Sequence, residues 1–221
     1  MSTKIPRPTP RSGARTRTGV IGRPPDVDGA DTRHEILQVA RRFFAEIGYA
    51  GTTTRMISDE VGVSSAAIHH YFGRKKDLAI AVWIDTTDKA YSRLYEAVRA
   101  ETTFQNKVGV LMNESYDDLR RDEETALFML TIREDARRTP ELAEIRGDNR
   151  LGKLIREIVD FGVETGAVNE AQRPLVQGAL SAVALGVTLL SIDVSARRTA
   201  QAVEGCRQLF GGTLISPPQS R

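Results

Sequence analysis

Residues 54–72, TRMISDEVGVSSAAIHHYF, decide the fold, because they hold two short helical patterns on either side of a glycine. Ile57 and Val61 lie one helical turn apart, which predicts a first short helix. Gly62 accepts the left-handed backbone that ends such a helix in a tight turn. Ser64 can then cap a second short helix. The stretch predicts a helix-turn-helix whose small core consists of Ile57, Val61, Val63 and Ile68.

An amphipathic helical pattern precedes this motif. Order is predicted to begin at Asp31 or Thr32, because Thr32 and Glu35 have the Thr-x-x-Glu spacing of a capping box. Gly48 is predicted to end this helix, since glycine accepts a left-handed cap. Between these ends, apolar side chains recur at helical spacing and predict one buried stripe: Ile36, Ala40, Phe43, Phe44 and Ile47.

The pattern stays helical from Gly73 to the end of the chain, without strand alternation or repeats. Breaks between helices are predicted near residues 101–103, 121–122, 139–140, 166–172 and 193–194. The sequence therefore predicts an all-α protein. Its predicted parts are a flexible basic arm at 1–30, a three-helix helix-turn-helix domain at 31–78, a larger helical domain at 79–212 and a flexible tail at 213–221.

Positive charge is concentrated at the N-terminal end of a chain whose formal net charge is only +2. Residues 1–30 carry six basic and two acidic side chains, whereas residues 79–221 are acidic overall. This asymmetry is typical of an end that approaches a polyanion such as DNA, although a solubilising tail has the same composition. Ile21-Gly22-Arg23-Pro24 is similar to the centre of a minor-groove AT-hook but lacks the flanking arginine, which favours nonspecific electrostatic contact.

The composition argues against several classes of protein. Cys206 is the only cysteine, which excludes an internal disulfide and a cysteine-based zinc cluster and fits a reducing cytoplasm. No apolar run follows Met1, so a secretory signal is not expected. Residues 174–192 carry no charged side chain and are long enough to span a membrane. Their polar residues and regularly spaced small residues favour instead a helix that is buried inside the protein.

The stretch from Asp31 to Trp83 resembles the tetracycline-repressor (TetR) family of transcription regulators. The motifs that match in order and spacing are Phe43-Phe44, Gly48-Tyr49, Thr52-Thr53-Thr54-Arg55-x-Ile57, Gly62-Val63-Ser64, His70-Tyr71-Phe72 and Lys75-x-Asp77-Leu78. The rest of the chain matches only in helical organisation and length. The resemblance implies an N-terminal DNA-binding domain followed by a helical domain for ligand binding and dimerisation.

The resemblance also implies which residues contact DNA. Those expected near the phosphate backbone or at the helix starts beside it are Thr53, Thr54, Arg55, Ser64, Tyr71 and Lys75. Those expected to face the bases are Ser65, Ala66, Ala67, His69 and His70. Ala66 and His69 stand where the family often has glycine and tyrosine, so the operator sequence is not predicted.

Some of these residues have other interpretations. Phe72 is expected in the core, and Tyr71 fits the core as well as a phosphate contact. Lys75 could be one solvated charge within Arg74-Lys75-Lys76, although its place in the motif favours phosphate. His69 and His70 are not expected to share a metal, because adjacent helical residues project about 100° apart. Neither a metal nor a cofactor is expected.

The central helices are expected to enclose a ligand cavity, as the resemblance implies. Aromatic and methionine side chains commonly line such cavities, and the candidates, each with plain core packing as its alternative, are Trp83, Met112, Tyr116, Phe128, Met129 and Phe161. Arg133 and Asp135 lie near an apolar run and could orient a polar ligand group, with solvated surface charge as the alternative. The small-molecule effector is therefore expected to be apolar or amphipathic.

The segment 174–192 is apolar around most of its circumference, which predicts that a second subunit covers the side that its own domain leaves open. Gly178, Ala182 and Gly186 form a stripe along which two helices could approach closely. A helix at 195–210 would complete a four-helix interface, with candidate contacts at Ala202, Cys206 and Leu209. The family resemblance points to the same two helices in a homodimer.

These patterns predict a dimeric, cytoplasmic, ligand-responsive transcription regulator rather than an enzyme. Two recognition helices about one duplex turn apart would read a palindromic operator in double-stranded DNA, and the expected action is repression relieved by a small molecule. Neither a Gly-x-Ser-x-Gly motif nor a P-loop occurs in the sequence. A membrane-associated helical scaffold built on 174–192 and an activator that needs a co-ligand stay open as alternatives.

Overall fold

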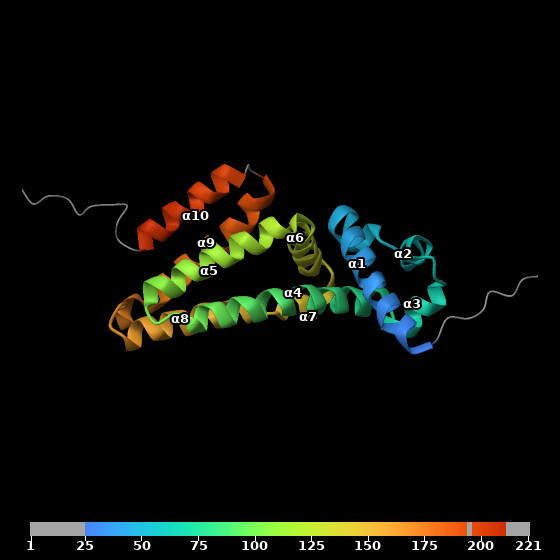
Figure 1. The fold of residues 1–221 in the computed structure, drawn as a ribbon, viewed down its shortest axis with the longest axis horizontal. Helices are drawn as coiled ribbons and strands as arrows, with labels where there is room; N and C mark the ends of the chain where they lie inside the picture. The colour runs from blue at the N-terminus through green and yellow to red at the C-terminus, as the bar shows by residue number, and fades with distance from the viewer. Residues whose placement is uncertain (1–24, 194–195, 211–221) are drawn as a thin grey trace, which may run out of the picture.

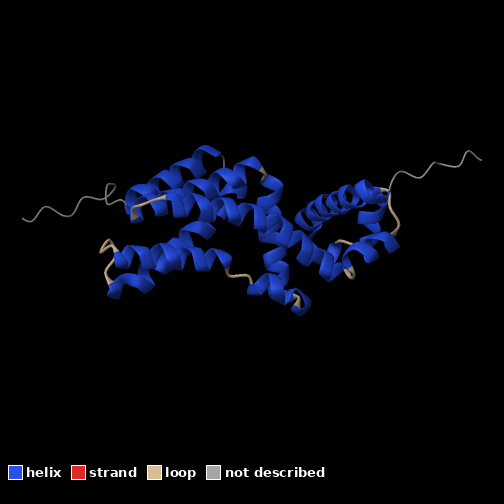
Figure 2. Cartoon of the chain, turned by 60° about the horizontal axis from the view of Figure 1, so that its bottom comes forward, coloured by secondary structure: helices blue, strands red, loops and turns tan. Residues whose placement is uncertain are grey.

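Every element that the structure describes is a helix, which confirms the all-α class (Figures 1 and 2). The structure is a computed structural model that describes residues 25–193 and 196–210. Its α-helices are α1 (Pro25–Gly51), α2 (Thr54–Val61), α3 (Ser65–Phe72), α4 (Lys75–Ala100), α5 (Phe104–Arg121), α6 (Glu123–Arg138), α7 (Ala143–Gly147), α8 (Arg150–Glu164), α9 (Arg173–Asp193) and α10 (Ala196–Phe210). Two 3-10 helices, η1 (Pro140–Leu142) and η2 (Glu170–Gln172), lie between them.

The first helix begins earlier than the sequence indicates. α1 starts at Pro25, so the predicted start at Asp31 or Thr32 is wrong, and residues 25–30 of the predicted arm are helical. Proline has the fixed φ that suits a first helical position. The rest of the predicted arm and the predicted tail lie outside the described residues. The predicted break at Gly48 is confirmed by its φ of 73°.

The predicted helix-turn-helix is present with the predicted caps. Thr53 accepts a hydrogen bond from the Met56 N–H at 3.2 Å and caps α2, and Ser64 accepts one from the Ala67 N–H at 3.1 Å and caps α3. Gly62 between them has the left-handed φ of 78° that the tight turn requires. The buried side chains that join the two helices are Ile57, Ser58 and Ile68.

Four of the predicted breaks coincide with the places where one α-helix ends and the chain turns, near 101–103, 121–122, 139–140 and 166–172. The fifth lies partly outside the described residues, since α9 ends at Asp193 and α10 begins at Ala196. The sequence does not predict the turn between α7 and α8 at 148–149. The stretch Gly147-Asp148-Asn149 consists of residue types that are common in turns, so a local signal for this break is present in the sequence.

Two hydrophobic cores organise the molecule. The N-terminal core joins α1, α2, α3 and the start of α4 to fully buried side chains of α6, η1 and α7, namely Phe128, Ile132, Ala136, Leu142 and Ile145. The C-terminal core packs the rest of α4 against α5, α8, α9 and α10. The predicted boundary at 78–79 therefore falls inside α4, a continuous helix that contributes to both cores and runs between the two ends of the molecule (Figure 1).

Candidate DNA-binding surface and ligand cavity

The outward side of α3 is a surface of small and polar side chains. Ala66, His69 and His70 are exposed and Ala67 is half-buried, because α3 packs on the domain through Ile68 on its opposite side. Short side chains on an exposed helix allow its backbone to approach another surface closely. A helix with this side free has the dimensions and shape to enter the major groove of DNA.

Two of the predicted base readers also hold the motif together. The Ser65 hydroxyl shares a hydrogen bond of 2.9 Å with the hydroxyl of Ser58, which in turn donates to the carbonyl of Arg55. His69 donates from Nδ1 to the carbonyl of Gly73 at 2.7 Å, because a carbonyl oxygen can only accept. A base contact by His69 would therefore use Nε2, and Ser65 ties α3 to α2.

Lys75 occupies a position that the sequence does not predict. Its Nζ donates to the carbonyls of Tyr49 at 2.8 Å and Thr52 at 3.0 Å and lies 4.2 Å from the centroid of the Tyr49 ring. A cation at this point stabilises backbone carbonyls at and just after the end of α1. Its predicted phosphate contact stays a prediction, and any such contact would use the remaining N–H.

The other predicted phosphate contacts lie at the surface of the same domain. Arg55 is exposed and pairs with Asp59 at 3.6 Å across one turn of α2, while Thr53 is exposed and Thr54 half-buried at its start. Tyr71 is half-buried, and its ring lies 5.7 Å from that of His70. Among the predicted phosphate contacts, the charged side chain of Arg55 is thus the one that interactions within the protein restrain least.

A cavity of about 700 Å³ opens between α4, α6, the α7–α8 turn, α8 and α9. Side chains from each of these elements line it, among them Tyr91, Met129, Arg133, Asp148, Leu151 and Thr188. A smaller, mostly apolar extension of about 70 Å³ shares four of these side chains and reaches Leu94 and Ser115. The combined space has the size and the mixed apolar and polar lining of small-molecule sites.

The structure separates the six predicted ligand-contacting residues. Met129 lines this cavity, and the other five do not. Trp83 and Phe128 lie in the N-terminal core, Met112 and Tyr116 lie in the C-terminal core, and Phe161 packs against Lys107 beside a shallow groove. Helical spacing identifies the buried side of a helix, but it does not identify the neighbouring helix that covers each residue.

The two charged candidates point in different directions. Arg133 lines the cavity, whereas the Asp135 carboxylate accepts a hydrogen bond of 2.6 Å from the backbone N–H of Tyr49 and so ties α6 to α1. A Cβ atom at position 48 would lie 3.1 Å from this carboxylate. Steric crowding, as well as the positive φ, therefore favours glycine at this position. Tyr91 is a cavity residue that the sequence does not single out, because its spacing on α4 equals that of core residues.

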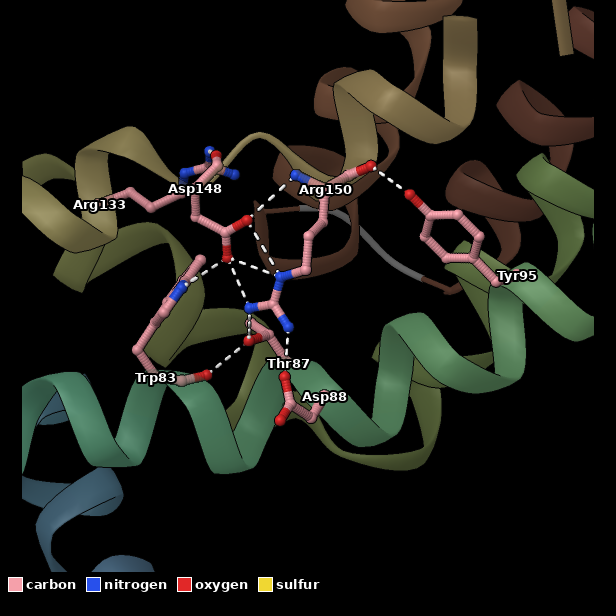
Figure 3. Close-up of polar contacts among 7 residues, drawn as sticks. All are labelled: Trp83, Thr87, Asp88, Tyr95, Arg133, Asp148 and Arg150. Atoms are coloured by element: carbon pink, nitrogen blue, oxygen red, sulfur yellow. Dashed lines mark hydrogen bonds and ion pairs between the residues drawn. The ribbon is translucent and has the colours of Figure 1, made fainter. Parts of the chain in front are cut away.

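A polar cluster fixes one wall of the cavity to α4 (Figure 3). Asp148 accepts hydrogen bonds from Trp83 Nε1 at 2.8 Å and from the backbone and guanidinium N–H groups of Arg150. Arg150 also contacts Thr87 and Asp88 on α4. Burial raises the pKa of the Asp148 carboxyl, but hydrogen bonds from Arg150 and Trp83 lower it by more, so the pKa lies below its ordinary value of 3.8.

Asparagine in place of Asp148 is expected to lower the free energy of unfolding by about 2 kcal/mol at pH 7, because Arg150 loses a charged partner in a half-buried site. Since the folded-state pKa is depressed, this stabilisation is fully present above about pH 4 and is lost as the pH falls through the folded-state value. Urea unfolding at several pH values measures both effects. Asp85→Asn, which loses only a pair with Lys89 on the same helix, is the control, and equal costs for both variants would contradict the prediction.

The last two helices leave apolar side chains uncovered. Leu175 is 74% exposed, Leu185 57% and Leu209 47%. Of the predicted interface residues, Gly178 and Ala182 are exposed, and Gly186, Ala202 and Cys206 are half-buried. Among the described residues one segment, Glu170–Leu190, also has the length and composition of a membrane span, which on its own is a weak indication.

Comparison with known proteins identifies the N-terminal region. Residues 36–82 match the family model described as bacterial regulatory proteins, tetR family. The chain is 35% identical over 111 residues to the HTH-type transcriptional repressor AcnR of Corynebacterium efficiens, a match that covers 50% of this chain and 54% of that protein. The chain therefore spans about half the length of this curated relative.

Two solved structures have the same fold over most of the chain. The fatty acid degradation regulator FadR from Bacillus halodurans aligns with a TM-score of 0.64 and 21% identity, covering 86% of this chain and 97% of that one. The regulator FadR from Bacillus subtilis, solved in complex with stearoyl-CoA, aligns with a TM-score of 0.63 and 18% identity, covering 83% and 99%. At these identities the similarity shows the fold alone.

Proposed function

Because residues 36–82 match the family model of the tetR bacterial regulatory proteins, we propose that the chain is a transcriptional repressor of this family that binds a DNA operator and is controlled by a small molecule. The observation that carries this proposal is the course of α4. This helix follows α3 after a turn of two residues and later forms part of the cavity wall. One continuous helix thus links the two proposed sites.

The exposed side of α3 would lie in the major groove. Ala66 and Ala67 would approach the base edges, and His69 would contact a base through Nε2. Arg55 and the basic residues that precede α1 would supply charge to the phosphate backbone, which positions the protein without specifying the sequence.

Ligand control would act through α6 as well as through α4. Arg41 of α1 forms ion pairs with Glu124 at 2.8 Å and Asp122 at 3.0 Å at the start of α6, and Asp135 holds the end of α1. A ligand that prefers a different position of α6 or α4 would therefore shift the helix-turn-helix domain and lower its affinity for DNA. The stearoyl-CoA complex of the Bacillus subtilis regulator supports a small-molecule site in this fold.

Dimerisation would cover the apolar surface of α9 and α10. Two copies related by a two-fold axis would bury Leu175, Leu185 and Leu209, and the exposed Gly178 and Ala182 would let the two α9 helices approach closely. The same axis would present two α3 helices to a palindromic operator. Burial of α9 in such an interface explains its composition without a membrane, and the proposed location is the cytoplasm.

Selection of bound sequences from a random duplex library tests the function directly, with enrichment of a palindrome as the expected result. Arg55→Ala is expected to weaken binding to the selected site about tenfold and to all sequences alike, because it removes a phosphate contact and reduces the dependence on salt. Arg156→Ala, an exposed arginine of α8, is the control. Failure to enrich any site, or equal effects of both variants, would contradict the proposal.

A further inference from the structure

The charges of the cavity indicate the class of its ligand. The charged side chains that line it are Arg133, Glu134, Arg137, Arg146 and Asp148. Both carboxylates already have partners, since Asp148 pairs with Arg150 at 2.6 Å and Glu134 pairs with Arg138 at 2.7 Å. A cationic ligand would have to displace one of these arginines before it could bind either carboxylate.

Arg133, in contrast, forms no ion pair within residues 25–193 and 196–210. Its Nη2 donates to the backbone carbonyl of Asp148 at 3.3 Å, and its guanidinium carbon lies 5.4 Å from the centroid of the Trp83 ring. These contacts hold the guanidinium in place without neutralising its charge. A half-buried guanidinium of this kind binds an oxyanion through charge-assisted hydrogen bonds, with little further cost of ordering.

Tyr91 lines the same cavity. The residue is only 8% exposed, and its hydroxyl makes no hydrogen bond to another residue that the structure describes. Burial raises the pKa of this hydroxyl, and the Arg133 guanidinium lowers it by less, so it stays a protonated donor near a positive charge. Tyr91 and Arg133 are therefore two hydrogen-bond donors in the lining of one cavity.

The apolar part of the cavity begins beside these donors. Tyr91 and Met129 line both the main cavity and its smaller extension, which continues between α4, α5, α6 and α9 to Leu94 and Ser115. An extended hydrocarbon chain would bury apolar surface there and so gain affinity from the hydrophobic effect. The site thus combines a polar head position with an apolar channel.

We propose that the effector of this protein is an amphipathic anion. Its carboxylate or phosphate head binds Arg133 and Tyr91, and its hydrocarbon chain enters the extension toward Leu94. This inference rests on the proposed function, because it names the ligand class of the same cavity. An uncharged ligand of equal length would leave the Arg133 charge uncompensated, and a cationic one would meet it directly.

Titration with four probes of equal chain length tests the ligand class. The probes are decanoate, decyl phosphate, decanol and decyltrimethylammonium, used below micelle-forming concentrations with the purified full chain. Trp83 is the only tryptophan and lies beside Arg133, so its fluorescence reports binding at the head position, and calorimetry gives an independent value. We expect at least one anion to bind about tenfold or more tightly than decanol, and the two anions distinguish a carboxylate from a phosphate head. Equal binding of decanol or of the cation, or no binding of either anion, would overturn the inference.

Two variants test the proposed donors. Arg133→Met removes the charge and nearly keeps the length of the side chain, and it is expected to weaken the binding of the anion about tenfold. Tyr91→Phe removes only the hydroxyl and is expected to weaken it less. Neither variant is expected to change the binding of decanol. Arg156→Met on the exposed surface of α8 is the matched control. Thermal unfolding of each variant excludes a loss of structure as the cause. Wild-type affinity of Arg133→Met for the anion would overturn the assignment.

Operator binding, measured with and without the anion, separates this inference from the proposed function. If the anion binds through Arg133 and leaves DNA affinity unchanged, the ligand class stands and ligand control of DNA binding fails. If DNA is bound and a different class of molecule releases it while neither anion binds, the proposed function stands and the inference fails.

Discussion

Glutamate in place of Ala66 is expected to weaken operator binding at least about 100-fold while the protein stays folded. Ala66 is exposed on α3, so a longer side chain costs no packing in the free protein. In the complex the carboxylate would push the helix away from the groove and bring a negative charge among the phosphates. Juxtaposed like charges at an interface cost several kcal/mol, and about 2.8 kcal/mol already corresponds to 100-fold.

Fluorescence anisotropy with the selected duplex at constant salt measures this effect, and thermal unfolding checks the fold. Ser92→Glu adds the same charge to an exposed position of α4, more than five helical turns along the chain from α3, and is expected to leave DNA binding near the wild-type value. If Ala66→Glu binds the operator within about threefold of wild type, α3 is not the helix that enters the groove.

Alanine in place of Phe128 is expected to lower the free energy of unfolding by about 3–5 kcal/mol, because it leaves a cavity in a closely packed core. Phe128 has no exposed surface, and its ring lies 6.5 Å from that of Trp83. Although it belongs to α6, it packs in the core that α1, α2, α3 and the start of α4 share. The substitution is therefore also expected to loosen the DNA-binding domain from α6.

Urea unfolding at constant pH measures this loss of stability. Leu127→Ala is the matched control, because it removes a large apolar side chain from the preceding position of α6, where Leu127 is 37% exposed. Its expected cost is about 1–2 kcal/mol, since more than a third of the residue stays in water and its removal leaves no closed cavity. Similar costs for the two substitutions would show that α6 does not contribute to the N-terminal core in solution.

Most of the DNA-binding domain could be predicted from the sequence, because short-range chemistry determines it. A cap such as Thr53 or Ser64 bonds an N–H three residues away, and Gly62 allows a left-handed turn through its own missing side chain. The same stretch carries the family resemblance, which the tetR family model at residues 36–82 confirms. The start of α1 is predicted too late because the composition of residues 1–30 indicates a flexible arm, whereas Pro25 within it occupies the first helical position.

The cavity could not be predicted in the same way, as two neighbouring residues illustrate. Phe128 and Met129 are both large, apolar and helical, yet Phe128 is buried in the N-terminal core and Met129 lines the cavity. Arg133 and Asp135 form a second such pair, since one lines the cavity and the other holds the end of α1. Adjacent helical side chains point about 100° apart, so each meets a different neighbour, and helical spacing does not identify that neighbour.

By itself, then, the sequence determined the helical class and the helix-turn-helix with its caps, because these depend on contacts within a few residues. Tertiary structure alone decided that α6 completes the core of the DNA-binding domain and that α4, α6, α8 and α9 enclose a cavity with Arg133 at its wall. These features join side chains far apart in the chain. Their position depends on how whole helices pack, which local propensity and hydrophobic periodicity do not specify.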